Sequence, residues 1–260
     1  MTNCSVFRGE PEYRLLRHCF SRQPSSETRR GEHLESCASR LTGALDPGFW
    51  SAIADATVVD FGCGYGEGTI ELARRGAGRV IGIDIRPEVL VPARERASRA
   101  GVADRCEFTA HAPSRLADYV VSIDAFEHFS EPAAVLKTMA NTLVPGGRVI
   151  ASFGPTWYHP RGGHLFSVFP WAHLLFSEAA LCRWRRDFRS DGAMRFAEVE
   201  GGLNRMTIRR FERLVAESPL TLERLHLRPI RAARFLHGRW SREFLTSVVD
   251  CVLVKRATSY

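Results

Sequence analysis

A glycine-rich loop is the first feature of the sequence whose residue types and spacing suggest chemistry. Segment 60–66 reads DFGCGYG, so every second residue of the loop lacks a side chain. Glycines allow positive φ angles and let a ligand approach the backbone closely. No Gly-Lys-Ser/Thr ending follows, which excludes a P-loop, and the spacing does not fit the third glycine of the dinucleotide fingerprint. Glu67 and Glu71 disfavour a phosphate at the next helix, so we expect either a ribose- and ammonium-bearing ligand without phosphate or a purely structural turn.

A second acidic residue ends the next apolar run. Asp84 lies near the end of segment 79–85, which reads RVIGIDI. A carboxylate at the C-terminal end of a second strand can accept hydrogen bonds from both hydroxyls of a ribose. Alone, Asp84 could equally cap the following helix. Together with the glycine loop it predicts a nucleoside-type ligand.

Three histidines follow two later apolar runs, 119–123 and 148–153. They are His128, His159 and His164. If both runs are parallel strands, their carboxyl ends border the ligand crevice of an open α/β sheet. A histidine near neutrality is the usual group that removes a proton from a hydroxyl or amine, so these three are the catalytic candidates; the alternative for His128 is packing. Zinc-type spacing is absent, and we predict no metal site.

The elements that must position these residues alternate along the chain. Short apolar runs predict strands at 57–61, 79–85, 107–110, 119–123 and 148–153. Helical patterns separate or follow them at 68–75, 87–99, 133–143 and 207–218. Two more strand-like runs, 220–228 and 247–255, close the pattern. Alternating strands and helices indicate βαβ units and a parallel sheet with right-handed crossovers.

Two segments do not fit that alternation. Residues 155–205 are rich in aromatic residues, histidine and arginine, with helical character near 170–187. We interpret them as an insertion that forms a substrate lid, although their aromatic residues could instead build the insertion's own core or touch a membrane or a dimer partner. Residues 1–55 are predicted to be an N-terminal helical cap segment, because apolar residues recur at helical spacing in its second half. The core then comprises 56–154 and 206–260.

The motifs together resemble one family. The chain combines 60–66 (DFGCGYG), Asp84, 118–122 (DYVVS), 127–129 (EHF) and 143–147 (LVPGG). In this combination it is similar to the class I S-adenosylmethionine-dependent methyltransferases over about residues 55–154. The resemblance implies an α/β, Rossmann-like doubly wound sheet of seven strands, mostly parallel with the last strand antiparallel, here with a helical lid insertion.

The resemblance also implies a cofactor, S-adenosyl-L-methionine, and its product, S-adenosyl-L-homocysteine. Matched to the family's motifs, the expected cofactor-binding residues are Asp60, Gly62, Cys63, Gly64, Gly66, Asp84, Ile85, His111, Ala112 and Asp124. One departure from the family is the stretch Ala110-His111-Ala112, which stands where Gly-Asp-Ala often meets the adenine. We expect His111 to occupy the place of that acidic residue, with a backbone group contacting the adenine.

Composition narrows the class and the compartment. The chain has 260 residues, 45% of them hydrophobic, which excludes a disordered or collagen-like chain. Seven cysteines without a CxxC pair argue against a disulfide framework and favour the cytoplasm. The longest apolar stretch, 164–176, is too short to span a bilayer, so we predict no stable membrane insertion. The 36 basic and 29 acidic residues give a net charge of +7, but acidic residues dilute the arginine clusters, which disfavours a nucleic-acid partner.

The sequence therefore predicts a methyltransferase that uses S-adenosylmethionine in biosynthesis. The expected acceptor is an oxygen, or a nitrogen, of a natural-product, sugar or lipid-like small molecule, and the enzyme is expected to be a monomer or homodimer. The alternatives are a nucleic-acid or protein methyltransferase, and a cofactor-binding homologue with altered chemistry, such as a cyclase or a scaffold.

Overall fold

A seven-stranded sheet forms the centre of the molecule. The computed structural model describes residues 9–20, 41, 47–113, 115–189, 192–199 and 202–256. The strands are β1 (Thr57–Phe61), β2 (Arg79–Ile83), β3 (Cys106–Thr109), β4 (Ala117–Ile123), β5 (Leu143–Phe153), β6 (Leu220–Pro229) and β7 (Thr246–Lys255). Their order is β3-β2-β1-β4-β5-β7-β6. β1 to β5 pair in parallel, and β7 is antiparallel to both β5 and β6, which confirms the predicted fold class.

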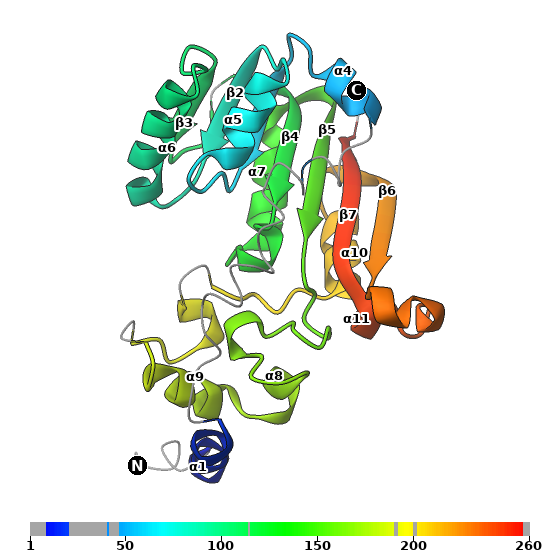
Figure 1. Ribbon diagram of the computed structural model, residues 1–260. Coiled ribbons are helices and arrows are strands. Elements are labelled where there is room, and N and C mark those ends of the chain that lie inside the picture. The colour runs from blue at the N-terminus through cyan, green and yellow to red at the C-terminus, as the bar shows by residue number, and fades with distance from the viewer. Residues whose placement is uncertain are drawn as a thin grey trace.

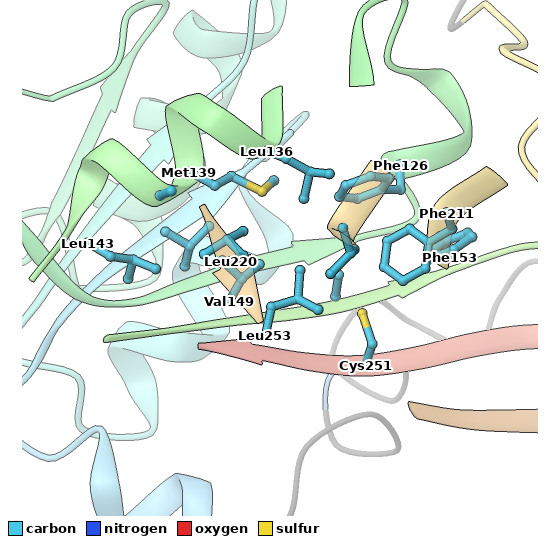
Figure 2. Close-up of a cluster of buried hydrophobic side chains, with 14 of the residues drawn as sticks. Phe126, Leu136, Met139, Leu143, Val149, Phe153, Phe211, Leu220, Cys251 and Leu253 are labelled. Carbon is cyan, nitrogen blue, oxygen red and sulfur yellow. The ribbon is translucent and has the colours of Figure 1, made fainter. Parts of the chain in front are cut away.

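Helices cover both faces of this sheet (Figure 1). On one face lie α4 (Pro47–Ala52), α5 (Glu67–Arg74) and α6 (Pro87–Arg99), and on the other lie α7 (Pro132–Thr142) and α10 (Ile208–Ala216). Figure 2 shows the second face, where Leu136 and Met139 of α7 and Phe211 of α10 pack over the strands. Burial on two faces explains why consecutive buried residues, including adjacent valines, occur in both β1 and β4, where a strand with one exposed face would alternate.

A further layer, made of helices, lies beyond the carboxyl ends of the parallel strands (Figure 1). It contains α1 (Glu10–Cys19), η2 (His164–Phe166), α8 (Ala172–Leu175), α9 (Glu178–Arg186) and η3 (Phe196–Glu198). This layer has its own hydrophobic cluster, in which Leu16 of α1 packs with Phe166, Leu181 and Trp184. The expected helix near 170–187 is two helices, because Ser177 caps the start of α9 by accepting from the N–H of Ala180.

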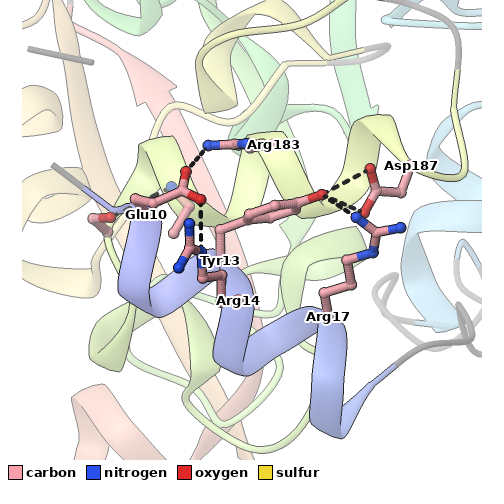
Figure 3. A network of polar contacts seen from close by, with 8 residues as sticks. Glu10, Tyr13, Arg14, Arg17, Arg183 and Asp187 are labelled. Atoms are coloured by element: carbon pink, nitrogen blue, oxygen red, sulfur yellow. Dashed lines mark hydrogen bonds and ion pairs between the residues drawn. The ribbon is translucent and has the colours of Figure 1, made fainter. Parts of the chain in front are cut away.

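Polar contacts join α1 to α9 across this layer (Figure 3). The Tyr13 hydroxyl donates to the Asp187 carboxylate at 3.1 Å, and Arg183 pairs with Glu10. Arg14 Nε also donates to the Glu10 carboxylate, at 2.9 Å. The bonds from Arg14 and Arg183 lower the pKa of the Glu10 carboxyl, since each favours its charged form. The chain's first described helix is therefore attached to the insertion rather than to the sheet.

The structure differs from the sequence prediction in two places, and a third prediction lies mostly outside the described residues. β5 begins at Leu143 and not at residue 148, because Ala117 of β4 pairs with Leu143 across an irregular register. The connection between β6 and β7 contains two helical turns that the sequence pattern did not indicate, η4 (Arg231–Leu236) and α11 (Arg242–Leu245). Most of the helix expected in the second half of residues 1–55 lies outside the described residues, although Leu41 is described and fully buried.

Candidate active site

The glycine loop joins β1 to α5 at the carboxyl edge of the sheet. The N–H groups of Gly62 and Cys63 both donate to the carbonyl oxygen of Ile83, at 2.8 and 2.9 Å. The end of β1 is therefore fixed against the end of β2. α5 begins directly after the loop, with Gly66 at its N-cap in the left-handed conformation.

Glycine is required in this loop for two separate reasons. Gly62 has φ +86°, and a Cβ there would lie 2.7 Å from the Cβ of Ala125. Gly64 has φ +51°, and among the described residues a Cβ there would come within 4 Å of the Arg86 guanidinium alone, at 3.9 Å. Gly62 is thus held in tight contact with the segment that follows β4, whereas the space over Gly64 is open to a ligand.

Asp84 is tied to the glycine loop. Its Oδ2 accepts from the N–H of Gly64 at 2.9 Å, and its Oδ1 accepts from the N–H of Arg86 at 3.0 Å. The Arg86 guanidinium also pairs with the carboxylate, with its Nε 3.1 Å from Oδ1. The glycine loop and Asp84, which were predicted from separate sequence runs, therefore form one structural unit. Arg86, which the sequence analysis did not single out, is the additional partner.

Asp60 lies beneath the loop rather than on its surface. The side chain is buried, and its Oδ2 accepts from the Thr69 hydroxyl at 2.7 Å. Burial raises the pKa of Asp60 to about 6, although the Thr69 bond favours the charged form. Asp60 thereby joins β1 to α5. Cys63 is also buried, and its burial raises the pKa of the thiol, so the structure gives it no nucleophilic character.

The residues expected near the adenine are exposed. Ile85 directly follows Asp84 and is 85% exposed, a large value for an isoleucine. His111 and Ala112 follow β3 and are exposed as well. The backbone N–H of His111 donates to the Thr109 hydroxyl at 3.2 Å, and its ring is left available at the surface.

The segment after β4 carries Asp124 and the short helix η1 (Phe126–His128). Asp124 has φ +53°, and its N–H donates to the Ser152 carbonyl at 2.8 Å, which ties the end of β4 to β5. Glu127 is buried, with Oε1 accepting from the N–H of Gly154 at 3.1 Å. Its Oε2 has no hydrogen-bond partner among the described residues. Burial raises the pKa of Glu127 to about 7, against the effect of the neighbouring His128.

His128 is held in a defined tautomer by the insertion. Its Nδ1 lies 2.7 Å from the carbonyl oxygen of Gly202. Because that oxygen can only accept, Nδ1 carries the proton and Nε2 keeps its lone pair in the neutral ring. The ring of His164 packs edge-on against it, with the ring centroids 5.4 Å apart. Two of the three predicted histidines therefore come together.

His159 does not join them. It is buried beside β7, where its Nδ1 accepts from the N–H of Arg161 at 3.0 Å and its Nε2 lies 3.5 Å from the Ser247 hydroxyl. Burial, together with the charge of Arg161, lowers the pKa of His159 to about 4. The ring is neutral near pH 7, and both of its nitrogens contact the protein, so a structural role suits it better than catalysis.

Asn204 is a residue that sequence reasoning missed. Its Nδ2 donates to the carbonyl oxygens of Phe126 and Phe129, at 2.7 and 2.8 Å, and its N–H donates to the Glu127 carbonyl. Together with Gly202 it holds η1 in place from the far end of the insertion. No local pattern could have indicated this, because the partners are more than seventy residues apart in sequence.

Within the described ranges, no group of three histidine, cysteine, aspartate or glutamate side chains is arranged to hold a metal ion. None of the helices in the described part of the chain is long and apolar enough to cross a membrane.

Known proteins resemble part or all of this chain. Residues 58–147 match the family model described as a methyltransferase domain. A ubiquinone biosynthesis O-methyltransferase of Neisseria meningitidis is 39% identical over 101 residues, which is 36% of this chain and 42% of that protein. A ribosomal protein L11 methyltransferase of Aeromonas hydrophila is 53% identical over 55 residues, 21% of this chain and 19% of that protein. The chain thus matches less than half the length of these curated relatives.

The fold comparison extends over the whole chain. The structure of magnesium protoporphyrin IX methyltransferase from Synechocystis PCC 6803 with bound S-adenosylmethionine superposes with a TM-score of 0.53, at 15% identity, and the match covers 98% of this chain and 100% of that one. At this identity the likeness concerns the fold. The chain is thus similar to methyltransferases in two respects: residues 58–147 match a methyltransferase domain, and the whole chain shares the fold of an S-adenosylmethionine-binding methyltransferase.

Proposed function

We propose that the chain is an S-adenosylmethionine-dependent methyltransferase that methylates an oxygen, or a nitrogen, of a small-molecule acceptor. The observation that carries this proposal is the hydrogen bond between Gly64 and Asp84, which joins an open glycine loop to a carboxylate at the end of β2. The family match of residues 58–147 supports it.

The residues at this edge of the sheet suit the proposed cofactor. The open space over Gly64 leaves room for the methionine and ribose parts. Asp84 has two carboxylate oxygens for the ribose hydroxyls once its bonds to the half-exposed Arg86 guanidinium are exchanged. The exposed Ile85 offers an apolar surface for the adenine. The acidic side chains Asp124 and Glu127 suit an ammonium group, and a cationic ligand favours their charged forms.

In the proposed reaction the protein mainly positions the acceptor and forms no covalent bond to it. The bound cofactor supplies an electrophilic methyl group on a sulfonium, and transfer is an in-line displacement. His128 Nε2 takes the acceptor's proton, while Nδ1–H stays bonded to Gly202 and holds the ring in the basic tautomer. His164 packs against that ring and orients the acceptor. The insertion excludes water from above, which is our proposal for its role as a lid.

Binding of the demethylated product tests the cofactor assignment. We expect Asp84→Ala to weaken S-adenosylhomocysteine binding by about a hundredfold, since two charge-assisted hydrogen bonds to the ribose are lost. Isothermal titration calorimetry measures this. Asp84→Asn is the second variant: its side-chain oxygen can still accept from Gly64 and keep the loop in place, but it offers one acceptor to the ribose instead of two.

The two variants separate loop structure from ligand contact. We expect Asp84→Asn to bind about tenfold more weakly than wild type and to unfold at a slightly lower urea concentration, because its amide nitrogen cannot accept from Arg86. Unchanged affinity in both variants would contradict the ribose assignment. An exposed glutamate on the same side of the sheet, Glu88→Gln, is the matched control and should bind like wild type.

A protein acceptor is the second candidate, favoured by the similarity to the ribosomal protein L11 methyltransferase. A polyanionic acceptor is less well supported, because an arginine in each of the two arginine clusters, 183–186 and 205–213, is paired within the chain. Arg183 pairs with Glu10, and Arg205 pairs with Glu178 at 2.7 Å. Radiolabelled methyl transfer to small-molecule, protein and RNA pools distinguishes the classes.

The remaining expectations concern the environment of the enzyme. We propose a cytoplasmic protein that acts as a monomer or homodimer. The five cysteines that the structure describes are all free thiols, which suits a reducing compartment. Size-exclusion chromatography with light scattering measures the oligomeric state.

A further inference from the structure

The connection between β6 and β7 forms a compact projection, residues 230–245, which we call the tip. It contains η4 and α11 and extends from the carboxyl edge of the sheet (Figure 1, orange to red). Its two ends are closed by the N–H of Ile230, which donates to the Leu245 carbonyl at 2.8 Å. Buried Glu243 accepts from the N–H groups of Ile208 and Arg209 and anchors the tip to α10. The tip is therefore an ordered element.

Large apolar side chains of the tip face solvent. Trp240 is 88% exposed, Phe235 79% and Leu236 60%. A folded chain gains free energy by burying such side chains, so a group of them on an anchored element indicates a surface that contacts something else. None of the three is needed to hold the tip together, since the anchoring bonds come from Ile230 and Glu243.

The charge around these side chains has one sign. Arg231, Arg234 and Arg239 are exposed, and none forms an ion pair with another described residue. By contrast, Arg242 at the base of the tip pairs with Glu212 at 2.6 Å. The single acidic residue of the tip, Glu243, is buried and occupied by backbone N–H groups. The exposed surface of the tip thus carries three positive charges and no negative one.

We propose that the tip docks on the surface of a membrane that contains anionic phospholipids. Tryptophan and phenylalanine enter the interfacial region of a bilayer, where an aromatic ring meets both acyl chains and headgroups. Nearby arginines gain free energy from the negative surface potential. A second copy of the chain is a poorer occupant, because a symmetric contact would set the three arginines against themselves. Leu236 and Phe235 suit acyl chains better than the backbone of a nucleic acid.

The tip also contacts the segment that leads from β5 into the insertion. The Phe244 ring packs against Tyr158, in the segment after β5, with ring centroids 5.3 Å apart. The connection therefore reaches the residues that lead into the insertion. Docking would orient the carboxyl edge of the sheet toward the bilayer. This proposal stands apart from the methyl transfer proposed above and needs no cofactor.

Vesicle binding tests the proposal with the intact chain. We expect wild type to cosediment with vesicles of phosphatidylcholine mixed with phosphatidylglycerol, but not with vesicles of phosphatidylcholine alone. Brominated acyl chains should quench the fluorescence of Trp240. The double variant Trp240→Ser, Phe235→Ser should lower the partition coefficient onto anionic vesicles by about tenfold or more. The triple variant in which Arg231, Arg234 and Arg239 are changed to Glu should lower it by a similar factor.

Matched controls come from exposed residues far from the tip. Val91→Ser removes an apolar side chain that is 56% exposed on α6, and Arg74→Glu reverses an exposed charge on α5. Both should bind vesicles like wild type, and all variants should keep the wild-type circular dichroism spectrum, since the changed residues are exposed.

Several outcomes would overturn the proposal. Failure of wild type to bind the anionic vesicles is one, and equal binding by wild type and the tip variants is another. A tip variant that converts a dimer to a monomer without affecting vesicle binding would assign the surface to a second copy. If an RNA oligonucleotide changed the fluorescence of Trp240 and vesicles did not, the surface of the tip would be assigned to nucleic acid.

Discussion

Neighbouring residues of η1 have opposite surroundings. Glu127 is buried, and one of its carboxylate oxygens has no hydrogen-bond partner in the described part of the chain, whereas His128 is half-buried and its ring is oriented by a carbonyl of the insertion. The first arrangement disfavours a charge on the carboxyl group, and the second leaves a lone pair on the imidazole available. These differences give each residue a prediction of its own.

His128 is expected to carry proton transfer. His128→Gln should lower kcat by about a hundredfold or more, because a positioned general base contributes at least that much. The affinity for S-adenosylhomocysteine should stay unchanged, which separates a base from a cofactor ligand. Steady-state kinetics on the acceptor identified by radiolabelling, with exposed His18→Gln as the control, provides the measurement. Equal kcat values in both variants would rule out this role.

Glu127 is expected to make stability depend on pH. Its pKa is about 7 in the folded chain and 4.5 as the ordinary value, so the folded state holds the proton more tightly. The contribution of Glu127 to stability is therefore fully present below pH 4.5 and is lost as pH rises through about 7. Glu127→Gln keeps an acceptor for Gly154 but cannot ionise, so it should be more stable than wild type at pH 8.

Urea unfolding at pH 5 and pH 8 checks this sign, because these two pH values lie on either side of about 6, the middle of the range between the two pKa values of Glu127. The advantage of Glu127→Gln should shrink at the lower pH. Exposed Glu131→Gln is the matched control and should show no such dependence. A constant difference between the mutant and wild type at both pH values would show that Glu127 does not titrate in this range.

At the level of elements, the glycine loop is the most sharply constrained segment. Gly62→Ala introduces both left-handed strain and a Cβ clash with Ala125, while Gly76→Ala at φ +104° meets no atom within 4 Å and introduces strain alone. We expect Gly76→Ala to cost about 1 kcal/mol. Gly62→Ala should cost more and also weaken S-adenosylhomocysteine binding by about tenfold, measured by urea unfolding and calorimetry. Equal costs would show that the Ala125 contact relaxes freely.

The same elements show how far sequence reasoning extends. β1 was predicted with its observed bounds, because a buried apolar run that ends at a glycine turn is a local signal. The early start of β5 depends on pairing with Ala117, and the position of His128 depends on Gly202. Such contacts join distant segments, so no local pattern contains them. The separation of His159 from the other histidines was hidden for the same reason.

On the scale of the whole molecule, the described residues form three separate hydrophobic clusters. Two lie on the faces of the sheet, and the third joins α1 to the insertion. We expect Leu16→Ala, at a fully buried site of the third cluster, to cost about 3 kcal/mol locally. Hydrogen exchange should then accelerate in α9 but not in β4.

Leu136→Ala is the matched control for this change, because it is equally buried but belongs to the cluster on the sheet. It should accelerate exchange in β4 and in α7. If Leu16→Ala accelerated exchange in β4 and α9 alike, the insertion would not open independently of the sheet, and the proposed lid would have to move with the core.

The attachment of α1 to α9 has a consequence for synthesis on the ribosome. Tyr13 and its partner Asp187 are 174 residues apart in the chain. At translation rates of about 5–20 residues per second, α1 emerges on the order of ten seconds or more before its partner exists. Throughout that interval the apolar face of Tyr13 and Leu16 has no native place to pack. The nascent chain therefore exposes an apolar segment early, and ribosome-associated chaperones can bind that segment throughout the interval.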